Sequence, residues 1–373
     1  MKTRKFGLAL SLVLATGTIL AACGEKEEAK PETPATPETP AATETPAFKV
    51  AMVTDVGGVD DKSFNQSAWE GLKEFGNANG LTEGETGYYY LQSQSDADYS
   101  TNLNTLARGG FNLVFGIGFL FETDMTTIAG QQANTNFAII DGTVTAPNVV
   151  SVLFKEQEAA FLAGVAAAKQ TKAEKIGFIG GMEIPVIERF EAGFIAGVKS
   201  VNPALEVESN YTGAFDKAEL GKTAANSMYS SGIDVIFHAA GGTGNGLFSE
   251  AKDLKKMDPT REIWAIGVDT NQTAEGIVKV GDTEYNVILT SAMKGVHNAT
   301  VSISELAMKG EFPGGTVMTY GLAEEGVELA PINEASEVKA DIEAAVAEYS
   351  KKIVAGEIVV PGTLEELKTF LGQ

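Results

Sequence analysis

Charged side chains follow several apolar runs of this sequence, at the point where each run ends. Asp55 follows AMVT, Asp141 follows FAII, Asp269 follows AIGV, and Lys294 follows LTSAM. Carboxylates accept hydrogen bonds and an ammonium group donates them, so together these residues could bind a polar ligand. A single aspartate at such a position more often caps a helix or forms part of a turn. Because the position recurs along the chain, we favour one shared binding cleft.

The stretch VTDVGGVDDKSFNQSAWEGL, residues 53–72, places an aromatic ring and an amide among acids. Phe64 offers an apolar face, and the adjacent Asn65 offers both a hydrogen-bond donor and an acceptor. Asp60 and Asp61 precede a helical pattern, where carboxylates favour the positive end of the helix dipole. We expect these two aspartates to start or cap the helix.

Short apolar runs alternate with helical patterns from residue 48 onward, in two series. The strands of the first series are FKVAMVTD, TGYYYLQS, FNLVFGIG, NFAIIDG and VVSVLF, with helices near 63–79, 99–109 and 121–134. Those of the second are KIGFIGG, LEVESNYTG, IDVIFHAAGG and EIWAIGVD, with helices near 185–201, 217–231 and 245–256. Nearly continuous apolar strands, each followed by a helix, predict parallel sheets covered on both faces. About 325 residues exceed one such core, so we predict an α/β protein with two doubly wound lobes.

A further strand and helix, within YNVILTSAMKGVHNATVSISELAMKG, come after the second series. If this unit returns to the first lobe, the chain crosses between the lobes more than once and forms a hinge. We therefore predict a first lobe from 48–151 and 271–310, and a second lobe with the hinge from 152–270 and 311–373. Ligands of open parallel sheets bind beyond the carboxyl ends of the strands, so the cleft between the lobes is the expected site.

The first residues predict export and a lipid anchor. A basic leader, MKTRK, precedes the apolar segment FGLALSLVLATGTILAA, and LAAC ends at Cys23, the only cysteine. This arrangement is typical of a signal peptide over 1–22 and resembles a bacterial lipobox, whose cysteine is diacylated after cleavage. The alternatives are an uncleaved anchor, for which the apolar segment is short, and an ordinary signal peptide.

The segment 23–47 is rich in Pro, Thr, Glu and Ala, and it contains no aromatic or large aliphatic residue. It cannot bury enough apolar surface to fold, so we predict a disordered linker with a reach of roughly 70 Å. Without the signal peptide the chain has 25 basic and 50 acidic residues. This charge repels nucleic acid and anionic lipid, so we expect a lipid-anchored protein on the extracytoplasmic face of the cell membrane.

Five stretches together resemble the basic membrane protein family, whose members are substrate-binding lipoproteins of ABC transporters, several of them for purine nucleosides. They are DVGGVDDKSFNQSAWEGL, FAIIDG, AAGGTGNG, IGVDTNQ and ILTSAMKG. The resemblance implies a type I periplasmic binding protein fold with three hinge crossings. It also implies capture of a nucleoside, expected to be a purine nucleoside, for an ABC transporter permease. By position, the implied ligand-binding residues are Asp55, Phe64, Asn65, Asp141, His238, Gly244, Asp269 and Lys294.

Within this implied site, Phe64 would stack on the base and Asn65 would suit a purine edge. His238 falls near the second stacking position of the family, where an aromatic residue is common, and an imidazole there could also charge. Strand alternation should turn the adjacent Phe237 into the core. The carboxylates would accept hydrogen bonds from ribose or base, and their charge would exclude nucleotides.

Two other classes of protein stay open from the residues alone. A nucleoside hydrolase-like enzyme would use the aspartates to hold calcium and activate water, and a receptor without a transport role would bind sugars, peptides or host proteins. The sequence shows neither the residue spacing of a calcium-binding loop nor a recognisable Ser/His/Asp or Cys/His set for nucleophilic catalysis. The stretch GGTGNG at 241–246 lacks the full Gly-x-Gly-x-x-Gly pattern of a dinucleotide-binding loop. We expect a monomeric binding protein that is not an enzyme and needs no metal or cofactor.

Cys23→Ser should release the protein from the membrane fraction, because no later segment of the sequence is apolar enough to span a bilayer. Ligand binding should be unchanged, since the substitution lies outside the predicted lobes. Cell fractionation followed by immunoblotting measures the release. Unchanged retention of the variant in the membrane would contradict the lipid anchor.

Overall fold

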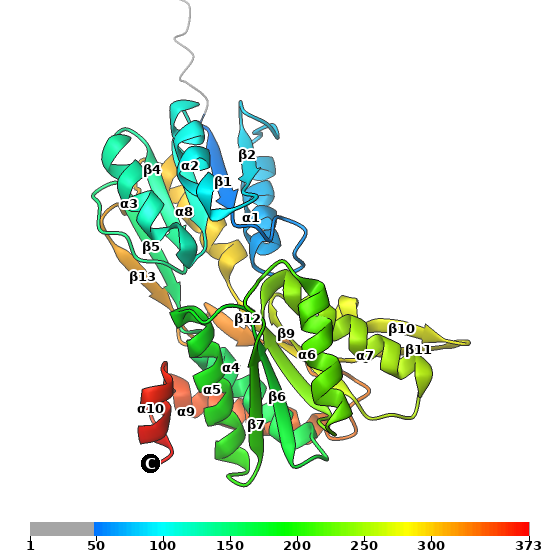
Figure 1. The fold of residues 1–373 in the computed structure, drawn as a ribbon. Coiled ribbons are helices and arrows are strands. Elements are labelled where there is room, and N and C mark those ends of the chain that lie inside the picture. The colour runs from blue at the N-terminus through cyan, green and yellow to red at the C-terminus, as the bar shows by residue number, and fades with distance from the viewer. Residues whose placement is uncertain (1–47, 373) are drawn as a thin grey trace, which may run out of the picture. The chain divides into compact units, whose positions relative to one another are not determined.

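The computed structural model describes residues 48–372, which contain two six-stranded sheets with helices on both faces (Figure 1). The predicted signal peptide, Cys23 and the whole of the linker predicted over 23–47 lie outside the described residues. Among the described helices, none combines the length and the apolarity needed to cross a membrane.

The first sheet is parallel throughout, with strand order β13-β5-β4-β3-β1-β2. Its strands are β1 (Val50–Thr54), β2 (Tyr88–Gln92), β3 (Leu113–Ile117), β4 (Asn136–Ile140), β5 (Val149–Phe154) and β13 (Val317–Tyr320). The flanking helices are α1 (Phe64–Ala78), α2 (Tyr99–Arg108), α3 (Glu122–Gln131) and α8 (Val296–Met308). Val50 and Met52 of β1 pack with α1 and α8, whereas Ala51 and Val53 pack with α2 and α3. Because both faces are buried, the strand is apolar at successive positions.

The second sheet has the order β14-β12-β9-β8-β6-β7 and is parallel except for the β12–β14 pair. Its strands are β6 (Lys175–Gly180), β7 (Glu206–Tyr211), β8 (Val235–Ala239), β9 (Trp264–Asp269), β12 (Ile288–Lys294) and β14 (Val327–Leu329). Helices α4 (Glu156–Gln170) and α5 (Pro185–Val201) pack on one face, and α6 (Ala218–Ser230) and α7 (Asn245–Met257) pack on the other.

The remaining elements surround these two sheets. β10 (Ile277–Val280) and β11 (Thr283–Asn286) form a separate antiparallel hairpin. Helices α9 (Lys339–Val354) and α10 (Leu364–Phe370) pack against α4 and α5. Short 3-10 helices are η1 (Asp96–Asp98), η2 (Phe119–Phe121), η3 (Gly241–Gly244) and η4 (Thr273–Gly276).

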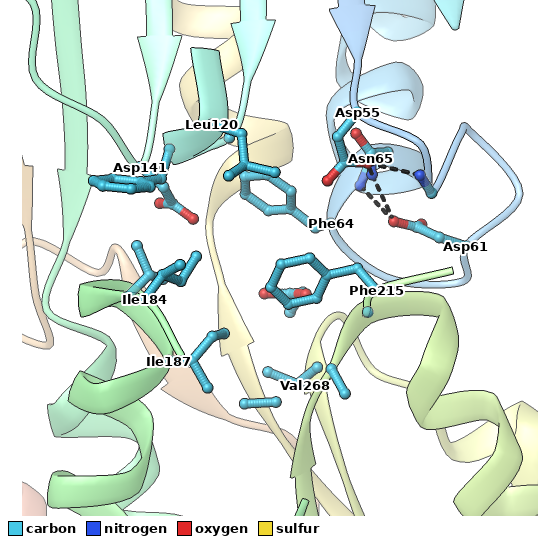
Figure 2. Close-up of a pocket in the computed structure, with 18 of the residues that line it drawn as sticks. Asp55, Asp61, Phe64, Asn65, Leu120, Asp141, Ile184, Ile187, Phe215 and Val268 are labelled. Atoms are coloured by element: carbon cyan, nitrogen blue, oxygen red, sulfur yellow. Dashed lines mark hydrogen bonds between the residues drawn. The ribbon is translucent and has the colours of Figure 1, made fainter. Parts of the chain in front are cut away.

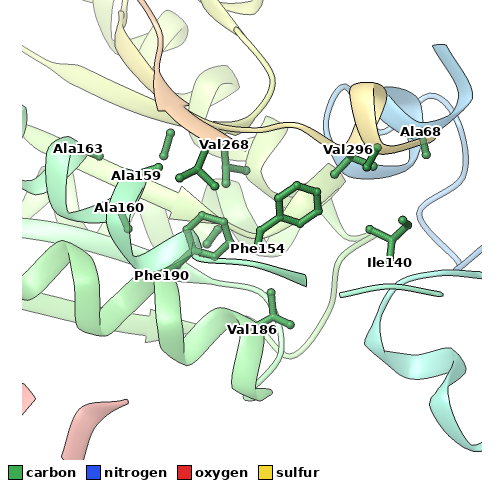
Figure 3. Packing of buried hydrophobic residues seen from close by; sticks show 14 of the residues in the cluster. Ala68, Ile140, Phe154, Ala159, Ala160, Ala163, Val186, Phe190, Val268 and Val296 are labelled. Carbon is green, nitrogen blue, oxygen red and sulfur yellow. The ribbon is translucent and has the colours of Figure 1, made fainter. Parts of the chain in front are cut away.

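Helix α4 was absent from the sequence prediction for a physical reason. Figure 3 shows Ala159, Ala160 and Ala163 of this helix in the core with Phe154 and Phe190. The helix is buried on most of its sides. It therefore lacks the one-sided apolar stripe that identifies a helix at the surface of a domain.

The chain passes between the two lobes three times. β5 leads through Lys155 into α4, β12 leads through Gly295 into α8, and residues 321–326 connect β13 with β14. Backbone hydrogen bonds join these crossings: the Lys155 amide donates to the Tyr320 carbonyl at 2.9 Å, and the Gly295 amide donates to the Gly326 carbonyl at 2.8 Å. The three crossings thus form one connected hinge.

The lobe boundaries differ from the predicted ones at two places. The predicted first-lobe segment 271–310 contains β12, which pairs with β9 in the second sheet, while its helix α8 packs against α1 of the first lobe. The predicted second-lobe segment 311–373 contains β13, which pairs with β5 in the first sheet. Apolar periodicity identifies a strand such as β12 but not the sheet that it joins, and the short strand β13 was not predicted at all.

Candidate functional site

A pocket with about 620 Å³ of empty space lies where the carboxyl ends of the two sheets meet (Figure 2). This space is partly open to solvent. The polar side chains that line it are Asp55, Asp61, Asn65, Asp141, Asp269 and Lys294. The larger apolar ones are Phe64, Phe119, Leu120, Ile184, Val186, Ile187, Phe190, Phe215 and Val268.

Two of the aspartates have the same unusual backbone conformation at the ends of their strands. Asp141 directly follows β4 with φ of 65°, and Asp269 ends β9 with φ of 64°. This left-handed region is sparsely populated by residues other than glycine, although aspartate tolerates it. Such backbone outliers cluster at functional sites. The recurrence in both lobes therefore supports the predicted role of the strand ends.

Lys294 is the centre of a buried ion cluster, with a side chain that is only 3% exposed. Its Nζ lies 2.5 Å from Asp141 Oδ2, 3.6 Å from Asp269 Oδ1 and 3.9 Å from Glu156 Oε1. The ammonium also lies 4.5 Å from the centre of the Phe64 ring, in cation–π geometry. Lys294 therefore joins a carboxylate of the first lobe to two carboxylates of the second.

The charges of this cluster depend on one another. Burial alone would lower the pKa of Lys294, but the three carboxylates outweigh that effect and raise it, so the ammonium stays charged. Burial raises the pKa of Asp269, although Lys294 and the Ser63 hydroxyl, which donates to Asp269 Oδ2 at 2.5 Å, oppose the change. Burial likewise raises the pKa of Glu156, and Arg189, whose Nε lies 2.6 Å from Glu156 Oε2, opposes it.

Asp61 holds the N-terminal end of α1, which confirms the capping role predicted for it. Its Oδ1 accepts hydrogen bonds from the amides of Ser63 and Gln66, and its Oδ2 accepts from the Asn65 amide. Asp60 is exposed to solvent. Asp61 also lines the pocket, a role that its position before the helix did not indicate.

Asn65 uses both of its amide hydrogens inside the protein. Its Nδ2 donates to Asp55 Oδ1 at 2.9 Å and to Asp61 Oδ2 at 3.0 Å. The Asn65 Oδ1 atom and the Asp141 Oδ1 atom are buried and have no hydrogen-bond partner among the described residues. Because buried polar atoms are normally paired, these two acceptors fit the donor groups of a ligand.

His238 and Gly244 do not line the pocket, in contrast to the site implied by the resemblance. The imidazole is fully buried, 5.0 Å from the Phe248 ring of α7, and Gly244 packs against it. Phe237 is buried on the opposite face of β8, as expected. The alternation of side chains along β8 could not predict whether His238 faces the core or the cleft, because helices cover both faces of this strand. Burial lowers the pKa of His238 to about 4, so it does not charge near neutral pH.

Phe215 provides the aromatic ring that the sequence analysis missed. It lies in the loop between β7 and α6, and it lines the pocket from the second lobe while Phe64 lines it from the first (Figure 2). The ring packs over Gly181, where an added Cβ would lie 2.2 Å from Phe215 Cε1. The available signal was a lone aromatic residue just beyond the carboxyl end of a predicted strand.

Within the described residues, no three His, Cys, Asp or Glu side chains are grouped so that they could hold a metal ion. The groups that the pocket presents to a ligand are carboxylates, one ammonium group, an amide oxygen and apolar surfaces from both lobes.

Asp55→Asn should stabilise the ligand-free protein at pH 7.5 and have little effect at pH 4. Burial, reinforced by Asp61, raises the pKa of Asp55 to about 6, although hydrogen bonds from Gly57 and Asn65 oppose this. An acid with a raised pKa binds more protons in the folded state, so its contribution to the unfolding free energy falls as pH rises from about 4 to 6. The variant should gain up to about 3 kcal/mol at pH 7.5.

Urea denaturation at both pH values measures this difference. Asp60→Asn, which removes an exposed charge from the same loop, is the matched control. Equal effects of Asp55→Asn at the two pH values would contradict the raised pKa.

Comparisons with known proteins agree with this architecture. Residues 48–363 match the Bmp family model, described as ABC transporter substrate-binding protein PnrA-like. The chain is 49% identical to a CD4+ T-cell-stimulating antigen of Listeria monocytogenes, with 97% of this chain and 99% of that protein covered. It is 46% identical to the ABC transporter nucleoside-binding protein BmpA of Lactococcus lactis, with 84% and 89% covered.

Among solved structures, a solute-binding protein of an ABC transporter system from Aeropyrum pernix superimposes with a TM-score of 0.75 at 27% identity, covering 87% of this chain and 96% of that chain. The predicted type I periplasmic binding protein fold is thereby confirmed. The chain belongs to the Bmp family of PnrA-like ABC transporter substrate-binding proteins.

Proposed function

We propose that this protein captures a purine nucleoside in the pocket between its lobes and delivers it to the permease of an ABC transporter. The observation that carries the proposal is a pair of aromatic rings, Phe64 and Phe215, which line one pocket from different lobes among unpartnered acceptors. Membership of the family and the similarity to a nucleoside-binding protein of Lactococcus lactis support the same class of ligand.

The two rings suit a flat base. Phe64 is the first residue of α1, and Phe215 follows β7, so both rings border the ligand only when the lobes are together. A ligand that contacts both rings binds the closed state better than the open state and therefore shifts the population toward closure. Ile187 and Val268 extend the apolar surface of the second lobe (Figure 2).

The polar groups lie at two ends of the pocket. Figure 2 shows Asp55, Asn65 and Asp61 at one end and Asp141 at the other. A nucleoside also has two polar regions, the edge of its base and the hydroxyls of its ribose. We assign the base edge to Asn65 and its neighbours. We assign the ribose to Asp141, Asp269 and Lys294, because the two carboxylates can accept hydrogen bonds from hydroxyl groups.

The anchor and the cellular location belong to the same proposal. A lipid on Cys23 would hold the binding lobes on the extracytoplasmic side of the membrane, within reach of a permease. The linker over 23–47 would give the lobes freedom to approach it. The proposal is for a monomeric binding protein.

Nucleosides should bind far more tightly than the corresponding monophosphates. Four aspartates and one lysine line the pocket, so a phosphate would meet net negative charge. Isothermal titration calorimetry with adenosine, guanosine and inosine and with their 5′-monophosphates measures the difference. A nucleotide that binds as tightly as its nucleoside would contradict the assignment of the carboxylates.

Phe64→Ala and Phe215→Ala should each weaken nucleoside binding by about 1 to 3 kcal/mol, which is roughly ten- to a hundred-fold, because each removes one stacking face. Calorimetry measures the affinity, and solution scattering should show less compaction on addition of ligand. Phe370→Ala, in α10 and outside the pocket lining, is the control. Large destabilisation with unaltered affinity would identify the substituted ring as an ordinary core residue.

A further inference from the structure

The segment Asp61–Ser63, which precedes α1 in the first lobe, is held by side chains of the second lobe. Asn245 Nδ2 donates to the Asp61 carbonyl at 3.0 Å, and Gln272 Nε2 donates to the Lys62 carbonyl at 2.8 Å. Thr270 Oγ1 donates to the same Lys62 carbonyl at 3.3 Å. Together with the bond from Ser63 to Asp269, these contacts cover three consecutive residues of the first lobe.

We propose that Asn245 and Gln272 are positioning residues that set the affinity for ligand by holding this segment in the closed state. The proposal rests on ligand binding in the pocket, as argued above. Neither residue lines the pocket, so their effect must pass through the segment that they hold.

The segment leads directly to the groups that face the ligand. Asp61 caps α1 and accepts a hydrogen bond from Asn65, and Phe64 follows Ser63 as the first residue of the helix. Lys62 has a φ of 62°, a left-handed conformation that is strained for residues other than glycine. Hydrogen bonds to its carbonyl in the closed state therefore favour the orientation in which the start of α1 faces the pocket.

His238 has a place in this arrangement. The Gln272 side-chain oxygen accepts from the Val268 amide at 2.8 Å and lies 3.1 Å from His238 Nε2. The Val268 amide can only donate, so it identifies that atom as oxygen and turns the Gln272 amino group toward Lys62. With the imidazole neutral, its Nε2–H donates to the same oxygen. His238 thus helps to orient Gln272, whose amino group donates across the cleft to the Lys62 carbonyl.

Asn245→Ala tests the proposal with little disturbance, because the side chain makes one hydrogen bond across the cleft and lies outside the pocket lining. A hydrogen bond contributes about 0.5 to 1.5 kcal/mol, so affinity should fall about 2- to 13-fold. The loss should be the same for adenosine, guanosine and inosine, since the side chain does not touch the ligand. The unfolding midpoint in urea should fall by no more than in the matched control, which also loses one hydrogen bond. The matched control is Asn79→Ala, which removes an asparagine bond to a backbone carbonyl within the first lobe.

Asn245→Asp provides a measurement that needs no ligand. It keeps the size of the side chain but turns a carboxylate toward the Asp61 carbonyl, so the ligand-free chain should show a larger radius of gyration in solution scattering. Both variants are made in the full chain with Cys23→Ser. Unchanged affinity in Asn245→Ala, a loss that differs among the three nucleosides, or an unchanged radius in Asn245→Asp would each overturn the proposal. A parent chain that binds none of the three nucleosides would instead contradict the proposed function, and the scattering comparison would still test the positioning role.

Discussion

A buried ammonium group at the hinge is the constraint on which the rest of the structure depends. Lys294 ends β12, immediately before the chain crosses to the first lobe, and its charge is removed from water. Such a charge requires compensation nearby, and the carboxylates that provide it come from both lobes, Asp141 from the first and Asp269 and Glu156 from the second. Separation of the lobes would leave Asp141 and Lys294 without each other. The pairing of Lys294 with Asp141 therefore favours the closed arrangement of the lobes, in which these charged side chains line one pocket.

The position of the pocket follows from the sheets. Parallel strands bring their carboxyl ends to one edge, and two such edges face each other when three crossings join the lobes. The walls divide by lobe, since four of the six polar lining residues come from the first lobe, and most of the larger apolar lining residues, among them Phe190 of α5 and Phe215, come from the second. Only closure brings the two kinds of surface to the same ligand.

A second layer of buried polar residues supports the pocket without lining it. Arg189 holds Glu156 near Lys294, and Gln272, paired with His238, reaches Lys62 across the cleft. His238 shows that a strongly shifted pKa does not by itself identify a ligand contact, because burial alone produces the shift. The role of His238 is better inferred from its hydrogen-bond partner Gln272 than from the ability of an imidazole to titrate.

The sequence by itself determined most of the strands and helices of the two sheets and the polar residues at several strand ends. Continuous apolar strands predicted covered parallel sheets, and the strand ends predicted Asp55, Asp141, Asp269 and Lys294, because both signals are local. The tertiary structure decided which sheet β12 and β13 join, and it decided that Phe215 faces the pocket while His238 is buried. Alternation assigns side chains to the two faces of a strand. Which face a helix covers, and which loop opens to the cleft, depends on segments that are distant in the sequence.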